Sequence, residues 1–409
     1  MGGPIALGLL ASYFAVALAG WAAAAIALVV AAPELAARSP LAPAPVLAAH
    51  LVALGFLPFV VTGASFHLLP VMLRNDVRHP ERLRLALPLL AGGFLVAPGL
   101  AFNNAGVLWP GAVLVAAGLL LVLSELIGLV CRAPGDRMLV ASRTGVALVT
   151  VHVAAALVLG ALVFSHGDEP YAGVDHGRWL LVHLHLAVLG WLTLLIVTVG
   201  RTLAPMLALA PTAPVRRLPV GELTLTIGLW TLLAGLAVAS MPAELAGGCL
   251  ALLTLGQFAR LLVRVARTRR IELEAPLAHL LSGVVFLLQA AALGIAILFG
   301  AVSPKTGLTA YVILLLLGWA GGVTLAHLGK VFSLSLWVWW PPGPRPKQAA
   351  LYPRRVWLAE AVAFSTGVEL LAVAALVGSV GTARAGGAAL VVAASLAAAG
   401  AALTWRRRW

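Results

Sequence analysis

Residues 4–32 read PIALGLLASYFAVALAGWAAAAIALVVAA, an apolar stretch that contains no Asp, Glu, Lys or Arg. About 20 consecutive apolar residues are enough to cross a lipid bilayer as a helix. The stretch is too long for the core of a signal peptide and has no basic lead, so we expect it to be a retained transmembrane helix. This stretch assigns the chain to the integral membrane proteins.

The rest of the chain continues in the same way. Of its 409 residues 62% are hydrophobic and only 10% are charged, and the mean hydropathy is +1.04, far from the values of soluble domains. We therefore expect an all-α membrane protein that forms one polytopic domain over residues 1–409. We place twelve transmembrane helices near residues 4–32, 49–73, 84–104, 107–131, 144–166, 179–209, 219–241, 243–266, 276–300, 308–339, 356–380 and 385–405.

The net charge is +13, which in a soluble protein would suggest a nucleic-acid partner. Here the basic residues gather in alternate connections between the predicted helices. This positive-inside pattern predicts that both termini are cytoplasmic and that the chain spans a bacterial inner membrane. Contact with anionic membrane lipid explains the charge, so no nucleic-acid partner is expected. The basic clusters are Arg74–Arg84, Arg132–Arg143, Arg201–Arg217, Arg260–Arg270, Arg345–Arg354 and Arg406–Arg408.

Two of the predicted helices share a sequence pattern. His50-Leu-Val-Ala-Leu-Gly-Phe56 in the second helix matches His185-Leu-Ala-Val-Leu-Gly-Trp191 in the sixth, and a proline follows twenty residues after each histidine, at Pro70 and Pro205. The tenth helix carries Gly318-Trp319 without the histidine. Since these helices are four apart, the pattern predicts three four-helix units around a pseudo-threefold axis. The predicted repeats cover residues 1–131, 144–266 and 276–405.

Histidines are unusually frequent inside the predicted helices. An ionisable side chain in lipid is costly and usually faces a cavity, a partner or a cofactor. A single one would more often be a hydrogen-bonded structural residue than a ligand. Seven in a chain with few other charged groups in its spans favour a cofactor. They are His50, His67, His152, His183, His185, His279 and His327.

Three of these histidines lie near the outer ends of the second and sixth helices. His50 and His185 hold the same position in the repeat, so their side chains are expected at one depth, as two axial ligands of one haem b require. His183 is about 200° round the helix from His185 and must face a different space, where it would bind a second haem or a metal. Gly55 and Gly190 either leave room for the flat macrocycle or simply permit close helix packing.

The other four histidines lie nearer the inner face. His67, His152 and His327 could bind a second haem or a copper ion, contribute to a proton path or a quinone pocket, or act independently at the interface. For His279 the sequence favours an independent interfacial side chain, because it stands close to the predicted end of its helix.

Two stretches resemble a known family. Residues His183–Trp191, followed by Pro205, are similar to the helix of the haem–copper oxidase main subunit whose paired histidines bind two haems. Residues His50–Arg74 resemble the second helix of the C-family oxidases, which supplies the other low-spin haem ligand. The resemblance implies twelve helices in three arcs, haem near the outer face, and cytochrome c or a quinol as a redox partner.

The sequence also departs from that family. Its paired histidines stand on the sixth helix rather than the tenth, and the seventh helix, residues 219–241, lacks the histidines of the copper site. None of the four tyrosines stands in a ligand motif. A complete oxygen-reducing haem–copper centre is therefore not expected, and whether the chain is an enzyme stays open. The shorter relatives, oxidase-subunit-I-like proteins and membrane haem proteins of the nitric-oxide response, are closer.

The leading hypothesis is a membrane b-type haem protein in electron transfer or in nitric-oxide or oxygen metabolism. His50 and His185 would hold a low-spin haem. If His183 binds a five-coordinate haem, its open face would bind a diatomic gas, NO or O2; if both sites are six-coordinate, electron transfer is the expected role. Arg178, at the outer mouth of the sixth helix, would either meet haem propionates or serve as an ordinary interfacial anchor.

The alternative is a transporter or channel without haem, in which the histidines handle protons or metal ions; internal repeats suit that class too. Against it, the helices carry no paired carboxylates. An assembly partner of an oxidase is a third interpretation that the sequence cannot separate from the first. The intramembrane carboxylates are interpreted as isolated, with either a structural or an interfacial role: Glu125, Glu244, Glu360 and Glu369.

Overall fold

The computed structural model describes residues 5–133, 140–167, 169–211, 219–270, 272 and 274–407. Four arginines of the basic clusters lie outside the described residues, namely Arg137, Arg216, Arg217 and Arg408. Over the described ranges the chain is helical between its connections, and the β-structure there is a single bridge between Tyr171 and Val174. The predicted all-α class is confirmed.

Twelve helices of the described chain are long and apolar enough to cross a membrane, as predicted. We number these spans 1 to 12. Spans 1 to 6 are α1 (Leu7–Val30); α3, η1 and α4 (Pro43–His50, Leu51–Phe56, Leu57–Met72); α5 and α6 (Pro80–Leu90, Gly93–Ala101); α7 (Ala105–Arg132); α8 (Val140–His166); and α9, η3 and α10 (His176–His185, Leu186–Thr193, Leu194–Leu207). Spans 7 to 12 are α11 (Val220–Val238); α12 (Met241–Thr268); α13 (Ala275–Leu298); α14, η4 and α15 (Pro304–Val312, Ile313–Gly321, Gly322–Val338); α17 (Arg354–Val377); and α18 (Val380–Arg406). The short helices α2 (Ala32–Ala36) and α16 (Gln348–Leu351) lie in connections.

Some spans begin earlier than the sequence suggests. Span 2 begins at Pro43 rather than near residue 49, because proline fits the first turn of a helix, where its missing N–H costs nothing. Span 12 begins at Val380 rather than near residue 385, because the Ser379 hydroxyl caps it by accepting a hydrogen bond from the Thr382 N–H at 3.2 Å. His50 therefore ends the first helical segment of span 2 instead of opening the span.

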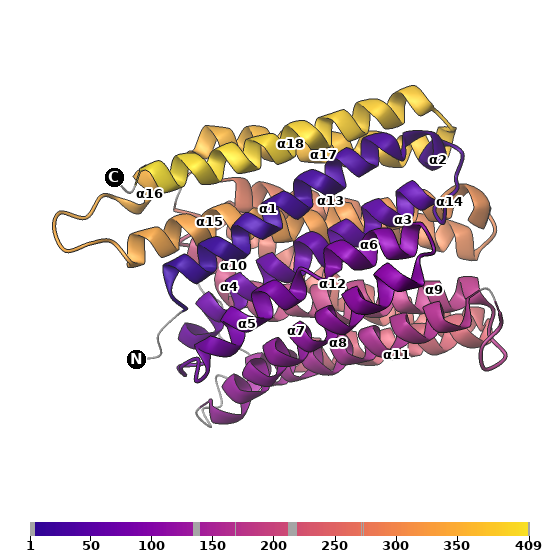
Figure 1. The fold of residues 1–409 in the computed structure, drawn as a ribbon, viewed down its shortest axis with the longest axis horizontal. Helices are drawn as coiled ribbons and strands as arrows, with labels where there is room; N and C mark the ends of the chain where they lie inside the picture. The colour runs from indigo at the N-terminus through magenta and orange to yellow at the C-terminus, as the bar shows by residue number, and fades with distance from the viewer. Residues whose placement is uncertain are drawn as a thin grey trace. The chain divides into compact units, whose positions relative to one another are not determined.

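The chain forms two compact units. Unit 1 contains Met1–Met72, Asp76–Glu125 and Leu273–Trp409; unit 2 contains Leu73–Asn75 and Leu126–Glu272. Spans 5 to 8, which make up the predicted middle repeat, belong to unit 2. Spans 1 to 3 and 9 to 12, with most of span 4, belong to unit 1, where α17 and α18 run side by side next to α1 (Figure 1).

Reciprocal glycine contacts join two neighbouring spans in each predicted repeat. A Cβ atom on Gly92 would lie 2.7 Å from the carbonyl oxygen of Gly111, and one on Gly111 would lie 2.8 Å from that of Gly92. Only glycine permits such an approach of two helix backbones. The same contact joins Gly228 to Gly247, at 2.9 and 2.6 Å.

The third such pair is Gly367 and Gly386, with 2.9 Å in both directions. Nineteen residues separate the two glycines of every pair. The pairs join spans 3 and 4, 7 and 8, and 11 and 12, so they occupy corresponding places in the three predicted repeats. This regularity supports the repeat independently of the histidine pattern.

In unit 1, α1 begins and α18 ends at the end where α16 also lies (Figure 1). The Arg407 guanidinium donates to the Ala350 carbonyl at 2.7 Å there. We call this the terminal end of unit 1. The interior of the unit holds Trp21, whose ring centroid lies 5.5 Å from that of Phe56 and 5.7 Å from that of Phe364. Aromatic packing thus joins spans 1, 2 and 11.

Candidate functional site

His50 stands in unit 1 at the junction of α3 and the π-helix η1. Its Nδ1 lies 2.9 Å from the carbonyl oxygen of Val46, four residues earlier. A carbonyl can only accept, so Nδ1 carries the proton and Nε2 carries the lone pair. A histidine that ligates a metal usually donates its other N–H in this way, which fixes the ring and its tautomer.

His185 has the same local geometry in unit 2. It ends α9, the π-helix η3 follows directly, and its Nδ1 lies 2.7 Å from the carbonyl oxygen of Leu181, again four residues earlier. The side chain is 5% exposed. The two histidines that the sequence selects are thus held in one tautomer by the same backbone contact, each within its own unit.

The structure describes three π-helical segments, η1, η3 and η4. They occupy spans 2, 6 and 10, and each begins within a residue of the repeat position that His50 and His185 define. π-Helices are rare and often mark functional positions. In span 10 the corresponding residue is Ile313, so the third segment has the backbone feature without the histidine.

A backbone carbonyl of the π-helix η3 contacts a buried histidine of unit 2. The Gly190 carbonyl lies 3.1 Å from Nδ1 of His152, which is almost fully buried and whose Nε2 has no hydrogen-bond partner among the described residues. A Cβ on Gly190 would meet Leu229 at 2.9 Å and His152 at 3.0 Å. Gly55 likewise packs against Gly20 and Phe94 within unit 1. Both glycines are thus sites of close packing within their own units.

His183 and His185 have different surroundings. The imidazole of His183 lies over Gly160 of α8, where a Cβ would be 2.9 Å from Cε1, 3.5 Å from Nδ1 and 3.7 Å from Nε2. Glycine at this position leaves room for the ring.

Arg178 is held by groups of unit 2. Its Nε lies 3.1 Å from an oxygen of Asp175, and its guanidinium donates to the Leu236 carbonyl near the end of α11 at 2.9 Å. The Glu244 carboxylate lies 4.0 Å away. These contacts anchor the start of α9 against spans 7 and 8.

The inner histidines have separate surroundings. Nε2 of His67 lies 2.9 Å from the Ser335 hydroxyl, which in turn donates to Val331, so His67 donates to the serine. Nδ1 of His327 lies 2.7 Å from the Val323 carbonyl. In the described part of the chain no three His, Cys, Asp or Glu side chains gather as a metal site would require.

His279 is not independent of other side chains, contrary to the prediction. Its side chain is 1% exposed, and its Nε2 lies 2.8 Å from Oε2 of Glu360, whose side chain is fully buried. Helix α13 is apolar on all sides, so its sequence does not indicate which face is inward. The signal that could have found the pair is depth, because both residues stand one to two turns from the starts of parallel spans.

The carboxylates of the spans are not isolated, contrary to the expectation from the sequence. Glu360 contacts His279, and Glu244 lies near Arg178. Glu369 accepts a hydrogen bond from Gln289 at 2.8 Å. Their partners are distant in sequence or uncharged, which is why a search for paired carboxylates does not reveal them.

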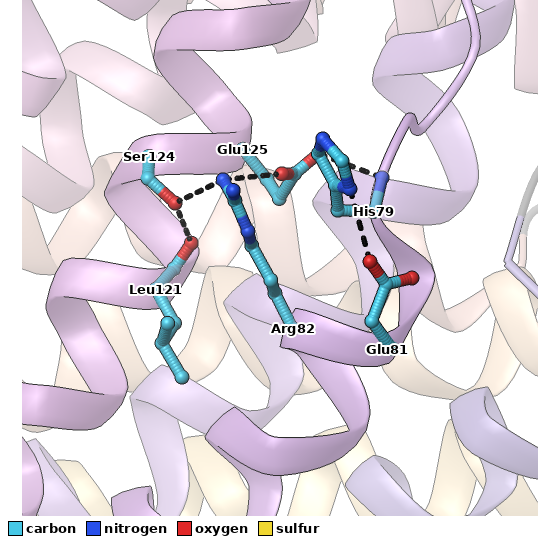
Figure 2. Close-up of polar contacts among 6 residues, drawn as sticks. All are labelled: His79, Glu81, Arg82, Leu121, Ser124 and Glu125. Carbon is cyan, nitrogen blue, oxygen red and sulfur yellow. Dashed lines mark hydrogen bonds and ion pairs between the residues drawn. The ribbon is translucent and has the colours of Figure 1, made fainter.

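Glu125 is the fourth case. Figure 2 shows the Arg82 side chain reaching α7, where its guanidinium lies 3.1 Å from Glu125 and 3.4 Å from the Ser124 hydroxyl. The backbone N–H of His79 donates to the same carboxylate at 3.3 Å, and the His79 ring meets Glu81. Every charged group in this cluster has a partner, so we assign it to holding the connection between spans 2 and 3.

Comparison with known proteins gives no family. No protein-family model matches the chain, and no curated protein matches it significantly in sequence.

Proposed function

We propose that this multi-pass membrane protein is a b-type haem protein, a divergent relative of the main subunit of haem–copper oxidases, that works in electron transfer or in nitric-oxide or oxygen metabolism. His50 and His185 would hold a low-spin haem. The bacterial inner membrane is the proposed location, from the distribution of basic residues.

One observation carries the proposal. His50 and His185 occupy the same repeat position, each directly precedes a π-helix, and each has its Nδ1 against the carbonyl four residues earlier. Neutral imidazole with a fixed tautomer is what a haem iron accepts. The assignment of both histidines to one iron rests on their equivalence in sequence.

His183 is the proposed ligand of a second haem or of a metal such as copper. When bound, a haem supplies one-electron chemistry, and an iron with an open position also binds a diatomic gas. The residues of this chain orient the imidazoles: Val46 and Leu181 fix two of them through their carbonyls, and Gly160 gives the third its space.

The test is optical. The protein is purified in detergent from haem-replete cells, and oxidised and dithionite-reduced spectra are recorded. We expect a sharp Soret band with split α and β bands that weakens strongly in His50→Ala and in His185→Ala. A colourless preparation would refute the proposal.

His327→Ala is the matched control. His327 is half-buried and has the same contact from Nδ1 to the carbonyl four residues earlier, but it does not stand at the start of a π-helix. The variant is expected to keep the bands that His50→Ala loses. Equal loss of the haem bands in all three variants would show that replacing any of these histidines has the same effect. It would contradict the assignment of His50 and His185 as the haem ligands.

A further inference from the structure

A group of polar side chains lies at the terminal end of unit 1, where spans 9 and 11 begin. Nζ of Lys330 lies 2.6 Å from Oε2 of Glu274, the residue that precedes α13. The same ammonium lies 5.3 Å from the ring centroid of Tyr352. The lysine is buried, and the glutamate keeps 15% of its side chain exposed.

One to two helical turns further in, His279 and Glu360 join α13 to α17. The edge of the Phe364 ring packs against the imidazole, with ring centroids 5.3 Å apart. Nδ1 of His279 and Oε1 of Glu360 are buried and have no hydrogen-bond partner among the described residues. Two unsatisfied polar atoms on adjacent buried side chains are unusual and require an explanation.

The Tyr352 ring lies under the Lys330 ammonium, two residues before α17 begins. Burial raises the pKa of its phenol, and the carboxylates of Glu274 and Glu360 raise it further. The backbone N–H of Ala275 donates to it. Tyr352 is therefore a neutral hydroxyl that can accept a proton on its oxygen and release its own.

Other charged and titratable groups stand on α17 itself and on neighbouring helices. On α15, the charge of Lys330 is balanced by Glu274, and Nδ1 of His327 lies 2.7 Å from the Val323 carbonyl. On α4, His67 is bonded to Ser335. Two further arginines, Arg354 and Arg355, stand at the start of α17.

The balance of protons follows. Neutral His279 with ionised Glu360 carries one negative charge, and one added proton makes the pair neutral, either as imidazolium with carboxylate or as imidazole with carboxylic acid. A net charge is costly in a buried, low-dielectric place, whereas a neutral pair is not. The pair is thus built to bind one proton.

We propose that His279 and Glu360 form a proton-binding site that exchanges with water at the terminal end of unit 1 through Tyr352 and the Glu274–Lys330 ion pair. In uptake, a proton from water reaches Glu274, the Tyr352 oxygen accepts it, and the phenol passes its own proton inward to the pair. The charge of the pair changes from −1 to 0, Tyr352 ends neutral, and release is the reverse.

Infrared difference spectroscopy of the purified full-length protein tests the site. Stepping the pH is expected to reveal a carboxyl band that Glu360→Gln removes. Glu369→Gln is the matched control, because Glu369 lies between the same two helices and accepts from Gln289, yet belongs to no such chain of groups. A band unaffected by Glu360→Gln, or lost equally in Glu369→Gln, would overturn the site. If Glu360→Gln does not accumulate, Glu360→Asp is expected to shift the band instead.

The route is tested by exchange into D2O. Tyr352→Phe and Glu274→Gln leave the pair in place, so the band should persist while its hydrogen–deuterium exchange slows about tenfold or more. An unchanged rate in both variants would overturn the route. The pair shares no residue with His50 or His185, so the infrared result is expected to be the same in His50→Ala, and failure of the haem proposal would leave this one standing.

Discussion

The Arg201 guanidinium donates to both carboxylate oxygens of Glu222, at 2.9 and 3.1 Å, and so joins span 6 to span 7 inside unit 2. Glu222 is 1% exposed, and Gly221 has no side chain where the guanidinium lies. Removal of one partner would leave a buried charge without compensation.

Arg201→Met is therefore expected to lower the free energy of unfolding by about 3 kcal/mol, because it leaves the buried Glu222 carboxylate unpaired. Arg201→Met with Glu222→Leu should cost much less, because it removes both charges together. Reversible unfolding in mixed detergent–SDS micelles measures both. A double variant as unstable as Arg201→Met would contradict the ion-pair explanation.

The glycine pairs predict a contrast between two adjacent residues. A Cβ on Gly247 would clash with the Leu232 backbone nitrogen, whereas one on Gly248 has nothing within 4 Å. Gly247→Ala is expected to destabilise the protein by about 1 to 3 kcal/mol. Gly248→Ala should be neutral or stabilise it by up to about 1 kcal/mol, since alanine favours the helix. Thermal unfolding of both variants measures the difference in stability. Equal changes in stability would show that the close approach of the two helix backbones at Gly247 does not require glycine.

Substitution of Gly160 is expected to change gas binding at the proposed His183 site. Gly160→Ala would displace the His183 ring, because the new methyl group would lie 2.9 Å from Cε1. If His183 holds an open iron, the variant should alter the spectrum with carbon monoxide or nitric oxide while the low-spin bands persist. Gas titration of the reduced protein measures this. Loss of the low-spin bands as well would mean that the two sites are not separate.

Ionisation of Tyr352 is expected to affect the stability of the protein at high pH. Its pKa is raised in the folded protein, so the stabilisation of its neutral form is complete below about pH 10, the ordinary pKa of tyrosine, and is lost as the pH rises towards the folded value. Tyr352→Phe cannot ionise, and its alkaline unfolding midpoint is expected to move to higher pH. Circular dichroism during a base titration measures the midpoint. Tyr171→Phe, a loop tyrosine, is the control and should leave it in place.

The two cysteines give a test of orientation. Cys131 is exposed near the end of α7, and Cys249 is exposed on α12. In a Cys249→Ala background, a membrane-impermeant maleimide should label Cys131 in inverted vesicles and not in right-side-out ones, because the basic clusters place this end in the cytoplasm. Labelling from the opposite side would reverse the orientation of the whole chain.

The sequence was sufficient for the spans and for the two histidines at the junctions. A long apolar segment is stable in lipid only as a helix, because the helix satisfies its backbone hydrogen bonds internally. The number and length of the apolar segments therefore suffice to predict twelve spans. The π-helices η1 and η3 could not be predicted, because a turn that bonds five residues back has no sequence pattern of its own. What the sequence did contain was the shared position of His50 and His185.

The polar contacts inside the spans were harder to predict. A span that is apolar on all sides has no preferred face, so His279 could not be assigned to a neighbour. Its partner Glu360 is 81 residues away in sequence. The glycine pairs could have been found, since their constant spacing is visible in the sequence itself.

The contact of Arg38 bears on how the protein is made. Its guanidinium lies 3.0 Å from the Ala375 carbonyl and also donates to that of Leu376, 338 residues further along the chain, at the end of α17. Each glycine-paired hairpin can close as soon as its two helices leave the ribosome, because its contacts are local. The connection after span 1, in contrast, makes this contact only after the eleventh span has been synthesised and inserted, so this part of unit 1 cannot be completed before then.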